Sequence, residues 1–179
     1  NNFWVADSVK GLLLKNNTVQ WMPLGGPNAR IQGMEAISEN ELIAPYGALT
    51  KGFAKFNESG WTSYQQLGAV QLPNLNASTI NNKERSYWFT TNSSIFYISN
   101  DNKAENIQPN NLLGAYKQIL TDPNNSIWAI QDQQGLVQQA NNRWNSIPLP
   151  NSYQKNGLNQ FIVNEKGQAW LIAPNNQAL

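Results

Sequence analysis

The sequence predicts an all-β protein, a β-propeller of about four four-stranded blades. Three observations predict this fold. Short apolar segments recur at a nearly constant spacing along the 179 residues, polar or glycine turns separate them, and no apolar pattern of helical period extends over three turns. A repeat of about 40 to 45 residues is that of a propeller blade. The length also suffices for one domain with a sizeable core.

Five apolar segments define the repeat. Taking the second residue of each as an anchor, successive anchors stand 38, 46, 40 and 42 residues apart, an average of 41.5. The anchors are Trp4, Leu42, Trp88, Trp128 and Trp170. They predict repeat units at approximately 1–29, 30–77, 78–114, 115–155 and 156–179.

Each anchor segment is expected to be the second strand of its unit. An alternating apolar segment that ends in a polar turn precedes it and predicts a hairpin, as at 34–40, 116–125 and 161–167. A small residue then opens a third strand, at Gly11, Gly52, Ser94 and Gly135. A fourth strand follows another turn and carries Trp21, Trp61, Ile107 or Trp144.

This strand count predicts a partial propeller. The chain begins at the second strand of one unit, passes through three complete units and reaches the second strand of a fifth. We therefore expect a part of a larger propeller, with strand edges exposed in its end blades. The longest step is assigned to an inserted loop at Leu72–Ile80.

Charge and composition exclude several classes of function. Only 13% of residues are charged, with 12 basic against 11 acidic side chains, so no strong field for nucleic acid or an anionic membrane arises. The chain has neither His nor Cys, which excludes the common nucleophile systems and the usual zinc, haem and iron–sulfur ligands. We therefore expect no enzyme activity, no cofactor and no metal. No apolar run reaches the roughly 18 residues of a membrane span.

Two segments resemble a known blade signature. Residues 4–12, Trp-Val-Ala-Asp-Ser-Val-Lys-Gly-Leu, and residues 127–136, which open Ile-Trp-Ala-Ile and end Gly-Leu, resemble the signature of two-component-regulator propellers. Within that group, the segment at residues 4–12 is similar to surface components of the type IX secretion system of Bacteroidetes. The second unit departs from the pattern, because Leu42 replaces Trp and residues 46–52 lengthen the following turn.

The resemblance implies a non-catalytic module at the outer-membrane surface of the cell envelope. Such a module would scaffold partner proteins such as the sortase, contact other blades or domains of its own polypeptide, and recognise anionic lipopolysaccharide. The alternative is a periplasmic glycan-sensing propeller domain of a hybrid two-component regulator. A transmembrane helix followed by a kinase domain would indicate the sensor, and a C-terminal β-sandwich with a sorting signal the secretion role.

Four loop residues are the candidate ligand contacts: Tyr46, Lys51, Lys83 and Arg85. The run Lys83-Glu84-Arg85 stands directly before the aromatic pair at 87–88, the one local concentration of basic groups beside aromatic residues. Basic side chains bind acidic glycans through charge-assisted hydrogen bonds. The structural alternative for the run is a solvated strand edge.

Other polar and aromatic residues have structural interpretations. The tryptophans recur at fixed blade positions, which favours packing between blades over stacking on sugars. Carboxylates such as Glu39, Glu41, Asp101 and Asp122 stand in turns, where turn chemistry explains them better than catalysis. The segment Asn100–Asn102 resembles part of a calcium loop but lacks its glycine and distal glutamate.

Overall fold

The computed structural model describes residues 3–7, 11–15, 22–23, 30–47, 50–109, 114–131, 135–141, 143–149 and 160–172. Over these residues the regular structure is β-strand throughout, with no α-helix, which confirms the predicted fold class. A helix long and apolar enough to cross a membrane is not found in this described part.

The described strands form six antiparallel sheets, of which five follow one another in chain order and are called blades 1 to 5, and the sixth is a small two-stranded hairpin after blade 2. Blade 1 contains β1 (Phe3–Asp7), β2 (Gly11–Lys15) and β3 (Met22–Pro23). Blade 2 contains β4 (Glu35–Ser38), β5 (Glu41–Pro45), β6 (Phe53–Asn57) and β7 (Gly60–Tyr64). Blade 3 contains β10 (Ser78–Asn81), β11 (Ser86–Thr90), β12 (Ile95–Ile98) and β13 (Ala104–Ile107). Blade 4 contains β14 (Tyr116–Thr121), β15 (Ile127–Gln131), β16 (Gly135–Ala140) and β17 (Arg143–Ile147). Blade 5 contains β18 (Gln160–Val163) and β19 (Ala169–Ile172).

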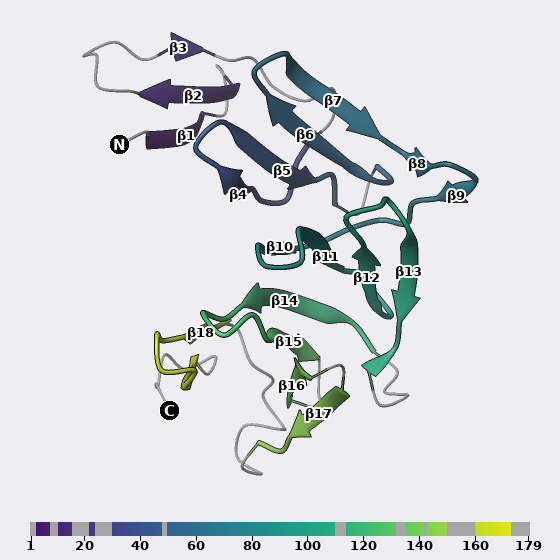
Figure 1. Cartoon of the computed structure of the whole chain (residues 1–179), viewed down its shortest axis with the longest axis vertical. Helices are drawn as coiled ribbons and strands as arrows, with labels where there is room; N and C mark the ends of the chain where they lie inside the picture. The colour runs from purple at the N-terminus through teal and green to yellow at the C-terminus, as the bar shows by residue number, and fades with distance from the viewer. Residues whose placement is uncertain are drawn as a thin grey trace.

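Figure 1 shows the blades following one another along an arc. The first strand of each complete blade lies toward the centre of the arc and the fourth strand lies at the periphery. The arc is open between blade 1 and blade 5. This radial arrangement of four-stranded meanders is that of a propeller, and its open side agrees with the predicted partial ring.

The anchor residues lie on the predicted strands. Trp88, Trp128 and Trp170 are on the second strands β11, β15 and β19. Trp4 is on β1, which opens the three-stranded sheet of blade 1 and so takes the place of a second strand. The fourth strands carry the expected Trp61, Ile107 and Trp144, whereas Trp21 lies outside the described residues.

Adjacent blades pack through apolar side chains of their first and second strands. Trp88 of blade 3 lies in one buried cluster with Tyr116 and Ile119 of blade 4. Trp128 of blade 4 lies in another with Phe161 of blade 5. Because each cluster combines residues of two neighbouring sheets, the core of this protein lies between its blades.

Hydrogen bonds made by side chains of the innermost strands join residues about one repeat apart. The hydroxyl of Thr79 donates to that of Thr121 at 3.1 Å. The Nδ2 of Asn81 donates to the carbonyl of Asn125 at 3.2 Å. The side chain of Gln118 binds both the backbone N–H and the carbonyl of Phe161, at 2.9 and 3.0 Å. These pairs are 42, 44 and 43 residues apart, close to the repeat read from the sequence.

The predicted insertion at Leu72–Ile80 is wrong in detail. Leu72 and Leu75 are core residues, and the end of the segment forms β10. The added length is instead taken up in part by a small hairpin, β8 (Gln66–Leu67) and β9 (Val70–Gln71). The proline and asparagine residues of this segment favoured a loop in the sequence, whereas its two leucines are buried in the structure.

Tyr116 provides a prediction about alkaline stability. Its side chain is buried, burial raises its pKa from 10.0 to about 12, and its hydroxyl has no hydrogen-bond partner. A group whose pKa is raised on folding stabilises the protein below its unfolded pKa and loses that contribution as pH rises through the folded value. We expect the free energy of unfolding to fall by about 2 to 3 kcal/mol between pH 10 and 12 for this reason.

The matched variant Tyr116→Phe is expected to lose this alkaline decrease. At pH 7 it should be as stable as the parent or slightly more stable, because it removes an unpaired buried hydroxyl. Urea denaturation at a series of pH values measures both effects. An alkaline decrease of equal size in parent and variant would assign it to other groups.

Candidate functional site

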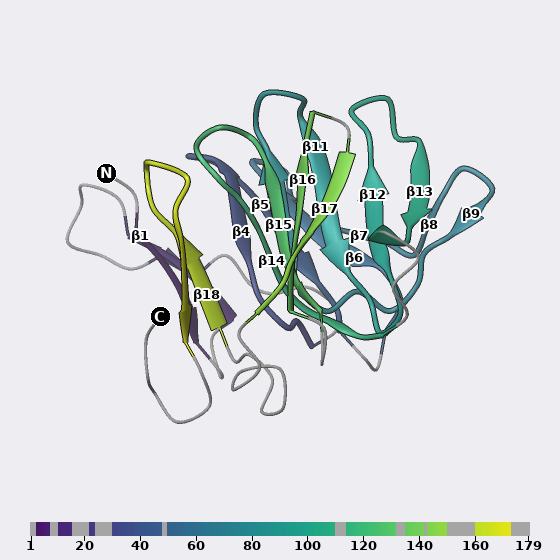
Figure 2. The same ribbon diagram turned by 90° about the horizontal axis from the view of Figure 1, so that it is seen from below.

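The antiparallel meander of each blade distributes the turns over two opposite faces of the arc. Turns between first and second strands, and between third and fourth strands, lie on the face drawn at the top of Figure 2, which we call the upper face. Turns between second and third strands lie on the opposite, lower face. Loop residues far apart in sequence therefore meet only when their turns lie on the same face of the arc.

The four candidate contacts are divided between these faces. Lys83 and Arg85 lie in the β10–β11 turn on the upper face, whereas Tyr46 and Lys51 lie in the β5–β6 turn on the lower face. Tyr46 was expected to contact a ligand, but its side chain is only 2% exposed and its hydroxyl bonds to Ser63 of β7. Tyr46 therefore stabilises blade 2, while the three basic residues are exposed.

The upper face has a pocket of about 680 Å³ between blades 2 and 3, which we call the upper pocket. Side chains from both blades line it: Ile37, Ser38, Glu41, Lys55, Ile80, Asn82, Arg85, Tyr87, Asn100 and Asn102. The upper pocket is thus lined by two cationic groups, one carboxylate, one phenol and three amides. Such a set offers many hydrogen bonds to a hydroxylated ligand together with positive charge for an acidic one.

Lys55 of β6 is the most constrained cation of the upper pocket. Its Nζ lies 3.5 Å from a carboxylate oxygen of Glu41, donates to the Tyr87 hydroxyl at 3.4 Å and stands 5.9 Å from the centre of the Tyr87 ring. Burial acts to lower the pKa of Lys55, but Tyr87 and Glu41 outweigh it and the net shift is upward. Lys55 therefore remains charged at neutral pH and has a fixed position.

The turn that carries Arg85 is held by an asparagine. The Oδ1 atom of Asn81 accepts the backbone N–H groups of Lys83 and Glu84, at 3.1 and 3.2 Å. Arg85 follows with a φ of 52°, in the left-handed region that side chains other than Asn and Gly rarely adopt. This turn places the Arg85 side chain along the upper pocket, whereas Lys83 is exposed in the same turn.

Sequence reasoning missed Lys55, Glu41 and Tyr87 as members of this site. Lys55 stands 30 residues before Arg85 and only the stacking of blades brings the two together. One signal was present, since Lys55 is a charged residue between the buried Ala54 and Phe56 of a strand. A long cationic side chain between buried apolar residues indicates an ion-pair partner nearby or a ligand-binding site.

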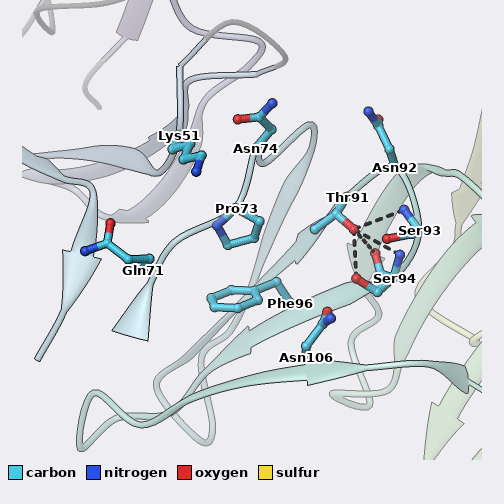
Figure 3. Close-up of a pocket in the computed structure, with 10 residues that line it drawn as sticks. All are labelled: Lys51, Gln71, Pro73, Asn74, Thr91, Asn92, Ser93, Ser94, Phe96 and Asn106. Carbon is cyan, nitrogen blue, oxygen red and sulfur yellow. Dashed lines mark hydrogen bonds between the residues drawn. The ribbon is translucent and has the colours of Figure 1, made fainter. Parts of the chain in front are cut away.

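The lower face has a separate pocket of about 520 Å³, shown in Figure 3. Lys51, Gln71, Pro73, Asn74 and Asn106 surround it together with the turn 91–94 and Phe96. Within the turn, the hydroxyl oxygen of Thr91 accepts the backbone N–H groups of Ser93 and Ser94, at 3.2 and 2.9 Å. Lys51 is the single charged residue that lines this pocket, whereas two cationic side chains line the upper pocket.

The turn carboxylates are engaged within their own turns. Asp101 forms an ion pair with Lys103 at 2.6 Å and a hydrogen bond with Ser99, and these contacts lower the pKa of Asp101 to about 2. Asp122 binds backbone N–H groups of its own turn and the indole N–H of Trp128. Over the described residues, no group of three acidic side chains is placed to hold a metal ion.

Solved structures with this fold include proteins of different function. The extracellular domain of a hybrid two-component system protein from B. thetaiotaomicron is 17% identical, with a TM-score of 0.67, over 98% of this chain and 26% of the other. PorZ, a surface component of the type IX secretion system of Porphyromonas gingivalis, is 16% identical, with a TM-score of 0.63, over 96% and 27%. Virginiamycin B lyase from Staphylococcus aureus is 14% identical, with a TM-score of 0.69, over 98% and 67%.

At these low sequence identities, the similarity to the three solved structures concerns the fold alone. No protein-family model and no curated protein sequence matches the chain. The chain spans about a quarter of the length of the two-component domain and of PorZ. In fold, the chain is a β-propeller segment that resembles the propellers of two-component regulators and of PorZ.

Proposed function

We propose that this chain is a non-catalytic, glycan-binding propeller module of a cell-envelope protein, in a secretion-system component of the PorZ type. Its ligand would be anionic lipopolysaccharide, bound on the upper face, and its other surfaces would hold partner proteins such as the sortase. The proposal depends chiefly on the upper pocket, where Lys55 and Arg85 stand among amide and hydroxyl groups.

The chemistry of the upper pocket suits an acidic sugar. Asn82, Asn100 and Asn102 supply neutral donors and acceptors, and two cations outnumber the carboxylate of Glu41. Hydrogen bonds from cationic donors to carboxylate or phosphate oxygens are stronger than bonds between neutral groups. Lys83, exposed in the same turn two residues before Arg85, is a further cation near this site, with the exposed Glu84 between the two.

Catalysis has less support than binding. The lyase with this fold depends on a histidine, because its histidine-to-alanine variant is catalytically inactive. The present chain has no histidine. Of the pocket residues, Glu41 pairs with Lys55, so no free acid–base pair stands in the upper pocket.

A second candidate is the extracellular glycan-sensing domain of a hybrid two-component regulator, located in the periplasm. Its support is the shared fold with two such domains of B. thetaiotaomicron. The same upper pocket would then bind a glycan signal. A kinase domain after a transmembrane helix in the complete polypeptide would favour this candidate, and a C-terminal β-sandwich with a sorting signal would favour the secretion role.

The proposed function is tested by direct binding of purified anionic lipopolysaccharide to the protein and to variants with one cation removed. We expect Lys55→Ala and Arg85→Ala each to weaken binding about 10- to 150-fold, since one charge-assisted hydrogen bond is worth roughly 1.5 to 3 kcal/mol. Affinity should also fall as salt concentration rises. Lys83→Ala is expected to have a smaller effect, because Lys83 is exposed and does not line the upper pocket.

Lys51→Ala is the matched control, because Lys51 is exposed on the lower face. It should bind like the parent. Loss of binding in Lys51→Ala with normal binding in Lys55→Ala and Arg85→Ala would place the ligand in the lower pocket. Turnover of a glycan by the protein would contradict the non-catalytic function.

A further inference from the structure

A second pocket of the upper face lies nearer the centre of the arc, and we call it the inner pocket. It has a volume of about 420 Å³. The innermost strands β4, β10, β14 and β18 line it, together with the turns that follow β10 and β14. Figure 1 shows these strands facing the centre of the arc. Residues of four successive blades thus meet in the inner pocket.

The inner pocket adjoins the upper pocket. Ile80 of β10 and Asn82 of the following turn line both of them. On β4, Glu35 of the inner pocket stands two residues before Ile37 of the upper pocket. The two pockets are therefore neighbouring sections of one groove. The upper section carries the cations Lys55 and Arg85, and the inner section carries the carboxylate of Glu35.

Glu35, the first residue of β4, is partly buried. Burial raises the pKa of its carboxyl group, and among the described residues no basic group or hydrogen-bond donor opposes that shift. A negative charge that is partly removed from water is unfavourable until a cation or a donor pairs with it. A positively charged group of a ligand would supply this partner. The inner pocket is therefore suited to a cation, whereas the upper pocket is suited to an anion.

The donor set of the inner pocket fits an amine better than a metal ion. Its other carboxylate, Asp122, already accepts the N–H groups of Asn124 and Ser126 and the indole N–H of Trp128. One available carboxylate does not supply the roughly six to eight oxygen ligands that Ca²⁺ takes. An ammonium group has three donors and needs one anion with a few neutral acceptors. The hydroxyl groups and amides that line the inner pocket provide such acceptors.

We propose that the groove binds a zwitterionic glycan, with an acidic group at Lys55 and Arg85 and a free amino group at Glu35. This inference rests on the proposed function, because its acidic end is the lipopolysaccharide site described above, and it narrows the ligand to lipopolysaccharide with unsubstituted amino groups. Asn82, which lines both pockets, would bind the sugar between the two charges. A second acidic group in place of the amine would be repelled by Glu35, so the groove selects against plain polyanions.

The test compares two preparations of one anionic lipopolysaccharide that carries free amino groups, the first untreated and the second with these groups N-acetylated. We expect the parent to bind the untreated form about tenfold more tightly, the usual effect of one hydrogen bond between charged groups. Glu35→Gln should bind both forms equally and fold normally, because it removes an unpaired charge. Arg85→Ala should weaken both forms and keep their ratio. Glu58→Gln, in the exposed β6–β7 turn of the same blade and outside both pockets, should bind like the parent.

A second probe separates this inference from the proposed function. A glucosamine trimer has free amino groups and no acidic group, and the N-acetylglucosamine trimer is its neutral counterpart. We expect the glucosamine trimer to bind the parent and to bind Glu35→Gln at least about fivefold more weakly. Trimer binding that depends on Glu35, without binding of lipopolysaccharide, would support the amine site and contradict the proposed function alone. Equal binding of both lipopolysaccharide forms by the parent, or an unchanged affinity of Glu35→Gln for the amine-bearing probes, would overturn the inference.

Discussion

Replacing Trp128 with alanine is expected to destabilise the protein by about 3 to 5 kcal/mol, the usual cost of truncating a large buried aromatic side chain. Trp128 is in the cluster that joins blades 4 and 5, with Ile130, Leu136 and Phe161. Its removal leaves a cavity between blades and also removes the partner of the Asp122 carboxylate, which accepts the indole N–H at 2.9 Å. Chemical denaturation of parent and variant measures the difference.

Trp170→Ala is the matched control for this prediction. The two tryptophans hold the same position in successive repeats, but Trp170 is half-exposed. Its replacement should cost less than about 1 kcal/mol, as for surface positions. A cost below about 1 kcal/mol for Trp128→Ala, or equal costs for both variants, would contradict the role of the repeat tryptophans in packing between blades.

Asp122→Ala is expected to cost roughly 3 kcal/mol, because it removes a buried charged acceptor from three donors at once. Its Oδ1 accepts the backbone N–H groups of Asn124 and Ser126, at 2.8 and 2.9 Å, and its Oδ2 accepts the Trp128 indole. The turn between β14 and β15 would lose its internal bonds while these donors remain partly buried. The free energy of unfolding from urea titration measures the loss.

The variant Asp122→Asn separates the contribution of the turn hydrogen bonds to stability from that of the indole contact. Its amide oxygen can still accept the two backbone N–H groups, while its NH₂ group cannot accept the Trp128 indole N–H. We therefore expect about half the loss seen for alanine. An asparagine variant as unstable as the alanine variant would contradict a separate contribution of the two turn hydrogen bonds, because only those bonds remain in asparagine.

The repeat made the blade architecture predictable, because the residues that fill the spaces between blades must recur at the blade period. Trp88, Trp128 and Trp170 illustrate this, since each stands on a second strand. The segment at Leu72–Ile80 was less predictable. Its proline and asparagine residues are typical of loops, but burial of Leu72 and Leu75 in the blade 2–3 core determines its path.

The candidate site was predictable only in part, because it consists of residues that meet through blade stacking. Arg85 was found from its local sequence, and it lines the upper pocket. Lys55 was not, since its partners Glu41 and Tyr87 come from two different blades. Tyr46 had the residue type and loop position of a ligand contact, yet its hydroxyl bonds inward to Ser63. Sequence alone did not distinguish an inward from an outward side chain in that turn.

The proposed glycan site is tested most directly by amide hydrogen exchange of the protein with and without anionic lipopolysaccharide. We expect slower exchange on binding in the β10–β11 turn, residues 82–85, and in the β12–β13 turn, residues 99–103, which both border the upper pocket. The lower-face turn 91–94 should exchange at an unchanged rate. Protection confined to residues 91–94, or no protection on either face at saturating ligand, would contradict recognition of lipopolysaccharide by the upper pocket.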